Sequence, residues 1–297
     1  MKDLVSVIIP TYNRSNMIDK AIQSCIDQDY FPIEIIVVED NANNIDERIK
    51  TKKIVDKYNN VKLIQNDTNL GGALTRNKGI EMANGKYVAF LDDDDYFTRD
   101  KISKQMKLMK ELEKQKIEVG MIYCYKYTYD KNNNIGKSRK VNVEGNCLYE
   151  HMLNIMETTS TWLCPKEVLI KVGMFENVKA HQDNILLMKI LANGYSIYRV
   201  PERLLYFYLH NGDGITSSNK AYIDKTKVLI EYKKKYYNLL TNKQIENVEY
   251  KNSSILIRLY RINNMKEEYN KEFKKVLKNN KFRWHTIKMY LFRFFMK

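Results

Sequence analysis

The chain has 297 residues, of which 44% are hydrophobic and 29% are charged. These fractions are ordinary for a globular protein with a sizeable core, so they exclude collagen-like, low-complexity and disulfide-scaffold proteins. No apolar run approaches the roughly 18 residues that a membrane-spanning helix needs. The apolar run before Pro10 is too short for a signal peptide, so we expect a cytoplasmic protein. The four cysteines are far apart, which favours buried thiols over disulfides or a zinc site.

The formal net charge of +14 is concentrated towards the C-terminus. Residues 225–297 hold 19 Lys or Arg and 6 Asp or Glu, whereas residues 1–224 hold 31 and 30. We therefore expect a nearly neutral body and a basic C-terminal region that faces a polyanion, either an anionic membrane or nucleic acid. The alternative is a solvated helical surface without such a partner.

Strands and helices alternate in the first 100 residues. Short β-branched apolar runs predict four strands, at 4–9, 34–40, 61–66 and 86–91. Apolar residues at helical spacing predict three helices, at 15–29, 45–58 and 72–84. Ser15 is the expected N-cap of the first helix and Gly85 the expected end of the third. This alternation predicts a mostly parallel sheet with helices on both faces.

The second half is less regular. It predicts four strands, at 119–129, 160–165, 195–200 and 203–210, the first of them turning back as a hairpin through 132–136. It also predicts three helical stretches, at 101–115, after Pro165 and at 182–192, and a basic helical pattern from about 222 to the end. The expected organisation is an α/β domain over 1–221, with halves 1–100 and 101–221, and a helical C-terminal region over 222–297.

Polar clusters follow three of the predicted parallel strands: Thr11-Tyr12-Asn13, Glu39-Asp40-Asn41 and Asp92–Asp95. Functional groups gather at the carboxyl ends of strands in such sheets. Four adjacent carboxylates repel one another, and oxygen ligands of this kind suit Mg²⁺ or Mn²⁺. An acidic turn that caps the next helix is the alternative.

Three further side chains suit a nucleotide. Asp40 could accept a hydrogen bond from a base, Tyr12 could stack on one, and Arg76 could lie near phosphate. The sequence has neither a G-x-G-x-x-G fingerprint nor a P-loop. Proteins without either motif can still bind the phosphates of a nucleotide diphosphate through a metal ion held by aspartates.

Seven segments, in order, resemble family 2 glycosyltransferases with the GT-A fold. They are VSVIIPTYNR at 5–14, EIIVVEDNA at 34–42, NLGGALTRNKGI at 69–80, GKYVAFLDDDDYF at 85–97, TTSTWLCPKEVLIKVGMFEN at 158–177, HQDNILLMKILANGY at 181–195 and LLYFYLHNGDGIT at 204–216. The resemblance covers about residues 3–217. It implies a Rossmann-like, mostly parallel sheet flanked by helices.

The resemblance also implies roles for matched residues. Asp92 and Asp94 form its D-x-D motif, with Asp94 the direct metal ligand and Asp92 nearer the ribose or a metal-bound water. His210 belongs to a tail motif that closes over the diphosphate and sometimes reaches the metal. The nucleotide pocket would include Pro10, Thr11, Tyr12, Asn13, Asp40 on the uracil edge, Arg76 on the diphosphate, and Asp93.

Asp183 matches the catalytic base of the family. Its neighbour is Gln182, where the family usually has Glu, and we expect Gln182 on the acceptor side. The tail motif also lacks the Arg often found beside the His. Trp162 is expected to stack on the acceptor sugar, with burial in the core as the alternative.

The expected function is inverting, metal-dependent transfer of a hexosyl or N-acetylhexosaminyl group. The donor would be a UDP-sugar and the acceptor a hydroxyl of a glycan or lipid-linked glycan in bacterial surface polysaccharide biosynthesis. Asp183 would remove the proton from that hydroxyl. The alternatives are a metal-dependent phosphatase, a nucleotidyltransferase, or a non-enzymatic polyanion binder.

The last segment, 281–297, mixes aromatic residues with Lys and Arg. This pattern predicts a helix lying on an anionic bilayer, which would place the protein at the inner face of the cell membrane. We expect no nucleic-acid partner. A helix docked on the body of the protein is the alternative.

Overall fold

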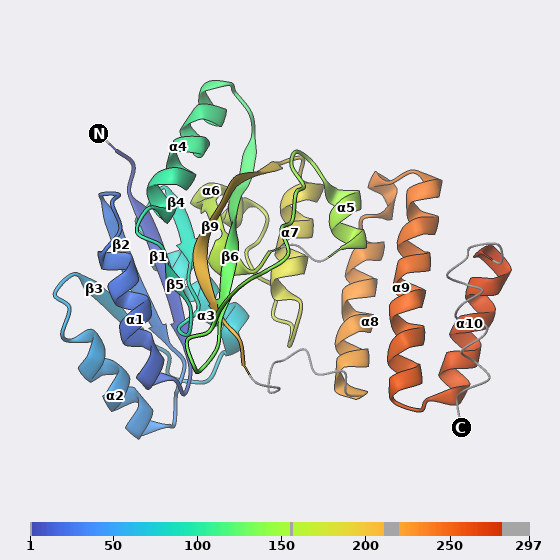
Figure 1. The fold of residues 1–297 in the computed structure, drawn as a ribbon, viewed down its shortest axis with the longest axis horizontal. Coiled ribbons are helices and arrows are strands. Elements are labelled where there is room, and N and C mark those ends of the chain that lie inside the picture. The colour runs from blue at the N-terminus through green and yellow to red at the C-terminus, as the bar shows by residue number, and fades with distance from the viewer. Residues whose placement is uncertain (1, 155–156, 211–219, 281–297) are drawn as a thin grey trace. The chain divides into compact units, whose positions relative to one another are not determined.

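The computed structural model describes residues 2–154, 157–210 and 220–280 (Figure 1). The chain divides into two compact units. The first comprises Met1–Leu148 and Met156–Asn211, and the second comprises Tyr149–Ile155 and Gly212–Lys297. The first unit holds all the strands of the described chain, and the second is helical.

The first unit begins with four parallel strands and three helices, as the sequence predicts (Figure 1). β1 lies between β2 and β4, and β3 pairs with β2 at the edge of the sheet. The strands are β1 (Val5–Thr11), β2 (Ile33–Glu39), β3 (Val61–Gln65) and β4 (Tyr87–Phe90). The helices are α1 (Ser15–Ile26), α2 (Ile45–Val55) and α3 (Gly71–Met82).

The same sheet continues in mixed orientation, in the order β3-β2-β1-β4-β8-β6-β9-β5, with β7 on β6. β8 is antiparallel to β4 and β6, β9 runs parallel to β6, and β5 is antiparallel to β9. These strands are β5 (Tyr96–Phe97), β6 (Val119–Tyr129), β7 (Ile135–Lys137), β8 (Leu163–Pro165) and β9 (Ser196–Tyr208). The remaining helices of this unit are α4 (Lys101–Lys114), η1 (Thr159–Thr161), α6 (Lys166–Lys171) and α7 (Gln182–Ala192). The predicted α/β class is confirmed.

Helices cover both faces of the sheet because successive side chains of a strand point in opposite directions. Val5, Val7 and Ile9 of β1 belong to a buried cluster with apolar residues of α1 and α4. Ile8 faces the other way, so close to Gly79 of α3 that a Cβ there would lie 2.4 Å from Ile8 Cγ2. This packing fixes the height of α3 against β1, and with it the position of the residues at the start of α3.

Three details of the predicted elements are wrong. The strands expected at 195–200 and 203–210 form one strand, because β9 stays paired to β6 through a shift of register at Tyr125. Ser15 is the first residue of α1 and Arg14 holds the N-cap position, without a side-chain capping bond. α3 ends at Met82, before Gly85. Glycine is instead needed at position 85 because the backbone passes very close to β1: a Cβ there would lie 2.7 Å from the backbone nitrogen of Ser6.

The described part of the second unit is an array of helices around its own apolar cluster, which includes Ile257, Tyr269 and Phe273. A capping box between Thr241 and Gln244 starts its longest helix. The described helices of this unit are α5 (Leu148–Leu153), all but its first residue, α8 (Lys220–Lys234), η2 (Tyr237–Leu239), α9 (Asn242–Ile262) and α10 (Lys266–Asn280). Within the described residues, no helix is long and apolar enough to cross a membrane. The expected membrane segment at 281–297 lies outside the described residues.

Candidate functional site

The four aspartates lie directly after β4, at the carboxyl edge of the parallel strands. The backbone N–H of Leu91 donates to the carbonyl of Ile8, so the chain leaves β4 still attached to β1. A turn then forms in which Asp95 N–H donates to Asp92 O. Three of the four side chains are buried, and only Asp92 is half-buried. Carboxylates crowded in this way require cationic or hydrogen-bonding partners.

Asp93 is held by β1 and by the residue before α1. Its carboxylate accepts a hydrogen bond of 2.8 Å from Thr11 Oγ1 and one of 3.2 Å from Arg14 Nη1. Burial and the neighbouring charge of Asp94 raise the pKa of Asp93 to about 6, although Arg14 and Thr11 oppose this shift. Asp93 is therefore a costly buried charge that depends on Arg14.

Asp94 has two partners on one oxygen. Arg14 Nη1 donates to Asp94 Oδ2, and His210 Nε2 lies 2.7 Å from the same atom. The hydroxyl of Tyr129 also donates to the backbone carbonyl of Asp94, which fixes the loop from the side of β6. The structure thus brings the predicted metal ligands Asp94 and His210 together.

Asp92 pairs with Arg76, whose Nη2 donates to Asp92 Oδ1. Arg76 Nη1 donates to the carbonyl of Gly72, and the guanidinium lies 5.9 Å from the ring centroid of Phe175. The Nε atom of Arg76 is buried and has no hydrogen-bond partner among the described residues. A spare buried donor beside a carboxylate suits an anionic ligand such as a phosphate.

Asp95 is 1% exposed, and its role differs from that of its three neighbours. Burial and the charges of Asp92 and Asp94 raise its pKa well above its ordinary value. The N–H of Tyr208 donates to Asp95 Oδ1 at 3.0 Å. Asp95 therefore fastens the end of β9, which leads to His210, to the aspartate loop.

Asp40 caps helix α3. Its Oδ1 accepts from the N–H of Leu70 at 2.9 Å and from Asn66 Nδ2 at 2.8 Å, and its Oδ2 accepts from the N–H of Gly71 at 2.8 Å. Only 3% of Asp40 is exposed. Its carboxylate satisfies the free N–H groups at the start of the helix that carries Arg76. The predicted contact with a uracil edge remains a prediction.

The Tyr12-Asn13 turn lies beside the aspartates. Tyr12 is 51% exposed, so its ring is accessible. Asn13 adopts the left-handed conformation with φ of 53°, which costs energy for a residue other than glycine. Two hydrogen bonds hold it: its N–H donates to Asn41 Oδ1 at 2.6 Å, and its Oδ1 accepts from Asn44 Nδ2 at 2.9 Å. The chains after β1 and β2 are thereby joined. Pro10 lies within β1, beyond the last residue that pairs with β4.

Asp183 and Gln182 begin helix α7. Within the described residues, Asp183 accepts hydrogen bonds only from Asn184, through its backbone N–H at 2.8 Å and its side-chain Nδ2 at 3.0 Å. Gln182 lies beside Arg76, since a Cβ on Gly72 would be 3.7 Å from Gln182 Oε1 and 3.1 Å from Arg76 Nη1. The start of α7 therefore adjoins the start of α3, on the side of Asp92.

Trp162 is 1% exposed, and its Nε1–H donates to the carbonyl of Glu157 at 3.0 Å. The expected stacking face is packed inside the protein in this structure, so an acceptor contact for Trp162 remains a prediction. The neighbouring Ser160 has a clear link to the site, because its Oγ accepts from the N–H of Asp92 at 3.1 Å.

Arg14, Tyr129 and Ser160 contact the aspartates but are not among the site residues predicted from the sequence. For Arg14 a signal existed, since it directly follows the Pro10–Asn13 segment. For Tyr129 and Ser160 none existed, because the contacts depend on how β6 and η1 cross the end of β4.

The residues present fit a divalent cation that is shared with a bound phosphate. In the described part of the chain, no group of three or more His, Cys, Asp or Glu side chains is arranged to hold a metal alone. Mg²⁺ commonly takes one or two carboxylates and completes its shell with substrate phosphates and water. Asp94 Oδ2, with His210 beside it, could serve as the carboxylate ligand of such a cation. In this structure the positive charge next to Asp94 Oδ2 is the guanidinium of Arg14.

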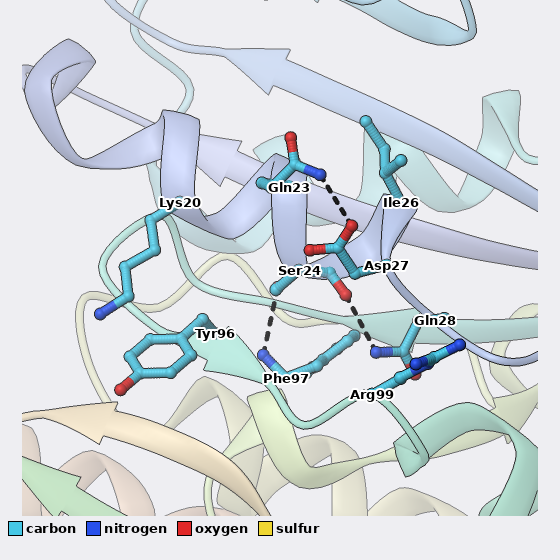
Figure 2. Close-up of a pocket in the computed structure, with 9 residues that line it drawn as sticks. All are labelled: Lys20, Gln23, Ser24, Ile26, Asp27, Gln28, Tyr96, Phe97 and Arg99. Atoms are coloured by element: carbon cyan, nitrogen blue, oxygen red, sulfur yellow. Dashed lines mark hydrogen bonds between the residues drawn. The ribbon is translucent and has the colours of Figure 1, made fainter.

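A pocket of about 760 Å³ is lined by the C-terminal part of α1 and by Tyr96, Phe97 and Arg99 (Figure 2). None of the predicted site residues lines it. Lys20 lies over the ring of Tyr96, with Nζ 3.5 Å from the centroid, and Gln23 donates to Asp27. These lining groups are paired with one another, so the aspartate cluster remains the candidate site.

Known proteins resemble this chain in sequence and in fold. The family model of Glycosyl transferase family 2 matches residues 6–177. TuaG of Bacillus subtilis, a glycosyltransferase assigned to teichuronic acid biosynthesis, is 29% identical over 225 residues, which are 74% of this chain and 83% of that protein. The Escherichia coli glucosyltransferase WfaP is 38% identical over 111 residues, 36% of this chain and 41% of WfaP. A Haemophilus influenzae glycosyltransferase, 41% identical over 106 residues (36% of this chain), is likewise matched over only 42% of its length.

Two solved structures share the fold. S. aureus TarS 1–349 in complex with UDP-GlcNAc has a TM-score of 0.64 at 18% identity, over 93% of this chain and 81% of that one. The mannosyltransferase PcManGT from Pyrobaculum calidifontis, in complex with GDP-Man and Mn²⁺, has a TM-score of 0.60 at 15% identity, over 92% and 74%. The fold is that of the GT-A glycosyltransferases, as the sequence predicts. Because the family model matches more than half of the chain, the chain belongs to glycosyl transferase family 2.

Proposed function

We propose that this glycosyltransferase moves a sugar from a UDP-sugar to a hydroxyl of a glycan or lipid-linked glycan, with inversion and with the help of Mn²⁺ or Mg²⁺. The observation that carries the proposal is the convergence of Arg14, Arg76 and His210 on the aspartates after β4. Three cationic or titratable groups from three separate elements gather at one acidic edge. Such an edge can exchange its partners for a metal-bound diphosphate.

The relatives support the donor and acceptor classes. WfaP is named for a UDP-glucose donor and a diphosphoundecaprenol-linked acceptor, and TarS was solved with UDP-GlcNAc. PcManGT was solved with GDP-Man and Mn²⁺, so the fold also accommodates a guanine nucleotide. A uridine donor and a surface polysaccharide product are therefore our proposals, with either a hexose or an N-acetylhexosamine as the transferred sugar.

The reaction needs charge stabilisation at the leaving oxygen and removal of a proton from the acceptor. A divalent cation, when bound, would neutralise charge on the diphosphate. Arg76 would donate to the same group, with its orphaned Nε–H available beside Asp92. Asp183, hydrogen-bonded only to Asn184 in the described chain, would accept the proton as the hydroxyl attacks the opposite face of the sugar. Attack from that face inverts the anomeric configuration.

The decisive experiment is a panel of UDP-, GDP- and TDP-sugars, scored for nucleotide release and then for product on a lipid-linked acceptor. We expect turnover with a UDP-sugar, loss of turnover in EDTA and recovery with Mn²⁺ or Mg²⁺. An NMR spectrum of the product would report the anomeric configuration. Turnover that persists in chelator would contradict the metal role, and release of free phosphate from phosphoesters would favour the phosphatase alternative.

We also propose that the basic C-terminal region holds the enzyme at an anionic membrane surface. The support is the sequence of 281–297, which combines aromatic with basic residues. When anionic liposomes are sedimented, the full chain should be found in the pellet. A chain truncated after residue 280 should stay in the supernatant. Equal sedimentation of both chains would show that this segment does not bind the bilayer.

A further inference from the structure

Two basic side chains contact the same oxygen atom, Asp94 Oδ2. Both Arg14 Nη1 and His210 Nε2 reach it, and Arg14 Nη1 also bonds Asp93 Oδ1 at 3.2 Å. The Asp94 side chain is 8% exposed, whereas that of Arg14 is 41% exposed. The carboxylate is therefore fixed in the protein, while its arginine partner approaches from the solvent side.

Arg14 is held at an unfavourable place. It occupies the N-cap of α1 and makes no side-chain capping bond there. The partial positive charge at a helix N-terminus repels a cation. The attraction of Asp93 and Asp94 offsets this repulsion, so Arg14 stays only while those carboxylates lack another cation.

Arg76 provides the contrast. Its side chain is 14% exposed, it also donates to Gly72 O, and it packs near the ring of Phe175. These contacts hold Arg76 whether or not Asp92 is neutralised. Of the two arginines on the aspartates, Arg14 is the one whose guanidinium, among the described residues, bonds only to the acids.

From these contacts we infer that Arg14 is a displaceable internal counter-cation, which occupies the metal-binding oxygen of Asp94 until a metal arrives together with a nucleotide diphosphate. This inference rests on the proposed function of the site. A divalent cation alone must compete with Arg14. A cation that arrives with a diphosphate brings extra ligands and offers the displaced guanidinium a new anionic partner. Metal and nucleotide therefore bind cooperatively, and by linkage each strengthens the other by the same factor.

The test is binding of Mn²⁺ to the full-length protein, followed by electron paramagnetic resonance, with and without UDP. Arg14→Gln removes the competing charge and keeps a side chain of similar reach. We expect Arg14→Gln to bind Mn²⁺ without UDP up to about fivefold more tightly than the wild type, since a partly exposed ion pair contributes up to about 1 kcal/mol. The factor by which UDP strengthens Mn²⁺ binding should fall correspondingly. Arg14→Lys, which keeps a cation with fewer donors, should lie between the two.

Arg99→Gln is the matched control. Arg99 is an exposed arginine of the same unit, and its guanidinium makes no hydrogen bond or ion pair among the described residues. The Arg99→Gln variant should bind Mn²⁺ with the affinity of the wild type. A thermal melt of each variant verifies folding.

The outcomes separate this inference from the proposed function. Equal Mn²⁺ affinity of wild type and Arg14→Gln without UDP, with normal Mn²⁺ binding in its presence, would overturn the role of Arg14 and leave the proposed function intact. Failure of the folded wild type to bind Mn²⁺ even with saturating UDP would overturn both.

Discussion

Two of the regions in which the first unit buries charged residues stabilise them in different ways. After β4, aspartates are paired with cations on other elements, and Arg14 among these cations is exposed enough to leave. In α4, Lys101 is 0% exposed and donates at 2.8 Å to Gln105 Oε1, a neutral group one turn along the same helix. Its Nζ also lies 4.1 Å from the ring centroid of Phe97.

The difference shows when buried charge indicates a binding site. Burial lowers the pKa of Lys101 to about 8, and three thiol groups nearby oppose that shift. Gln105 passes the connection on, donating to the carbonyls of Ile122 and Thr161 at 3.1 and 2.8 Å. Every partner in this network is internal, so it joins α4 to β6 and η1. The aspartates instead have an exposed cationic partner, Arg14, and we propose that a ligand replaces it.

The largest loss of transfer activity should follow removal of the Asp94 carboxylate. Asp94→Asn removes the anchor for a metal, and we expect transfer to fall by about a thousandfold or more, since a bound metal contributes several kcal/mol to such reactions. Initial rates with saturating UDP-sugar would measure it. Asp19→Asn, at a side chain of α1 that is 51% exposed, is the control and should keep its rate. A rate for Asp94→Asn within tenfold of the wild type would mean that the aspartates after β4 serve structure alone.

The next effect concerns an acid outside the aspartate cluster. Asp183→Asn should lower transfer by at least about a hundredfold, the low range for loss of a general base, because the acceptor proton then has no receiver. UDP binding, measured by calorimetry, should not change. Glu167→Gln, at an exposed acid on α6, is the matched control. Unchanged transfer by Asp183→Asn would remove Asp183 from the catalytic role.

The Lys101 network predicts a pH effect on stability. Its pKa is about 8 in the folded protein and 10.5 ordinarily, so between these values the unfolded chain keeps a proton that the folded chain has released. The free energy of unfolding should therefore rise with pH over this range, by about 3 kcal/mol for this group. Guanidinium denaturation of the wild type and Lys101→Met at several pH values would measure the difference.

In that experiment Lys107→Met, at an exposed lysine of the same helix, is the control and should follow the wild type. Lys101→Met should lack the rise and should keep its transfer activity. Parallel curves for the wild type and Lys101→Met would mean that Lys101 is not desolvated as the structure indicates.

The smallest effect tests the support of the aspartate loop. Tyr129→Phe removes the hydroxyl that donates to Asp94 O, and we expect binding of UDP with Mn²⁺ to weaken by up to about tenfold, the net value of one hydrogen bond. Tyr206→Phe is the control, because the hydroxyl of Tyr206 makes no hydrogen bond among the described residues while its ring stacks in the same group. Equal weakening by both variants would assign the effect to the ring stack.

The predictable part of the molecule is the first half, in which short parallel strands alternate with helices. Short apolar runs separated by helices place Thr11, Asp40 and Asp92 at one edge without knowledge of any side-chain contact. The second half obeys no such rule, since β8 and β6 insert between β4 and β9. A polar interruption at Pro201-Glu202 suggested two strands, but pairing with β6 carries β9 through it.

The partners of individual side chains could be predicted from the sequence less well than the strands and helices. The sequence places Arg14 beside the nucleotide segment, but its pairing with Asp93 and Asp94 depends on the angle at which α1 leaves β1. The burial of Trp162 likewise depends on packing around η1, because an aromatic residue between apolar neighbours suits a core and a sugar platform equally well.

The capping of α3 by Asp40 has a consequence for how a pyrophosphate can be held. In P-loop proteins the open N-terminus of a helix receives the phosphates. Here the protein's own carboxylate already fills that anion hole, with the amides of Leu70 and Gly71 directed at it. A pyrophosphate arriving at this edge finds no vacant helix end on α3, so its neutralisation falls to mobile cations and guanidinium groups, and its affinity should decline steeply as ionic strength rises.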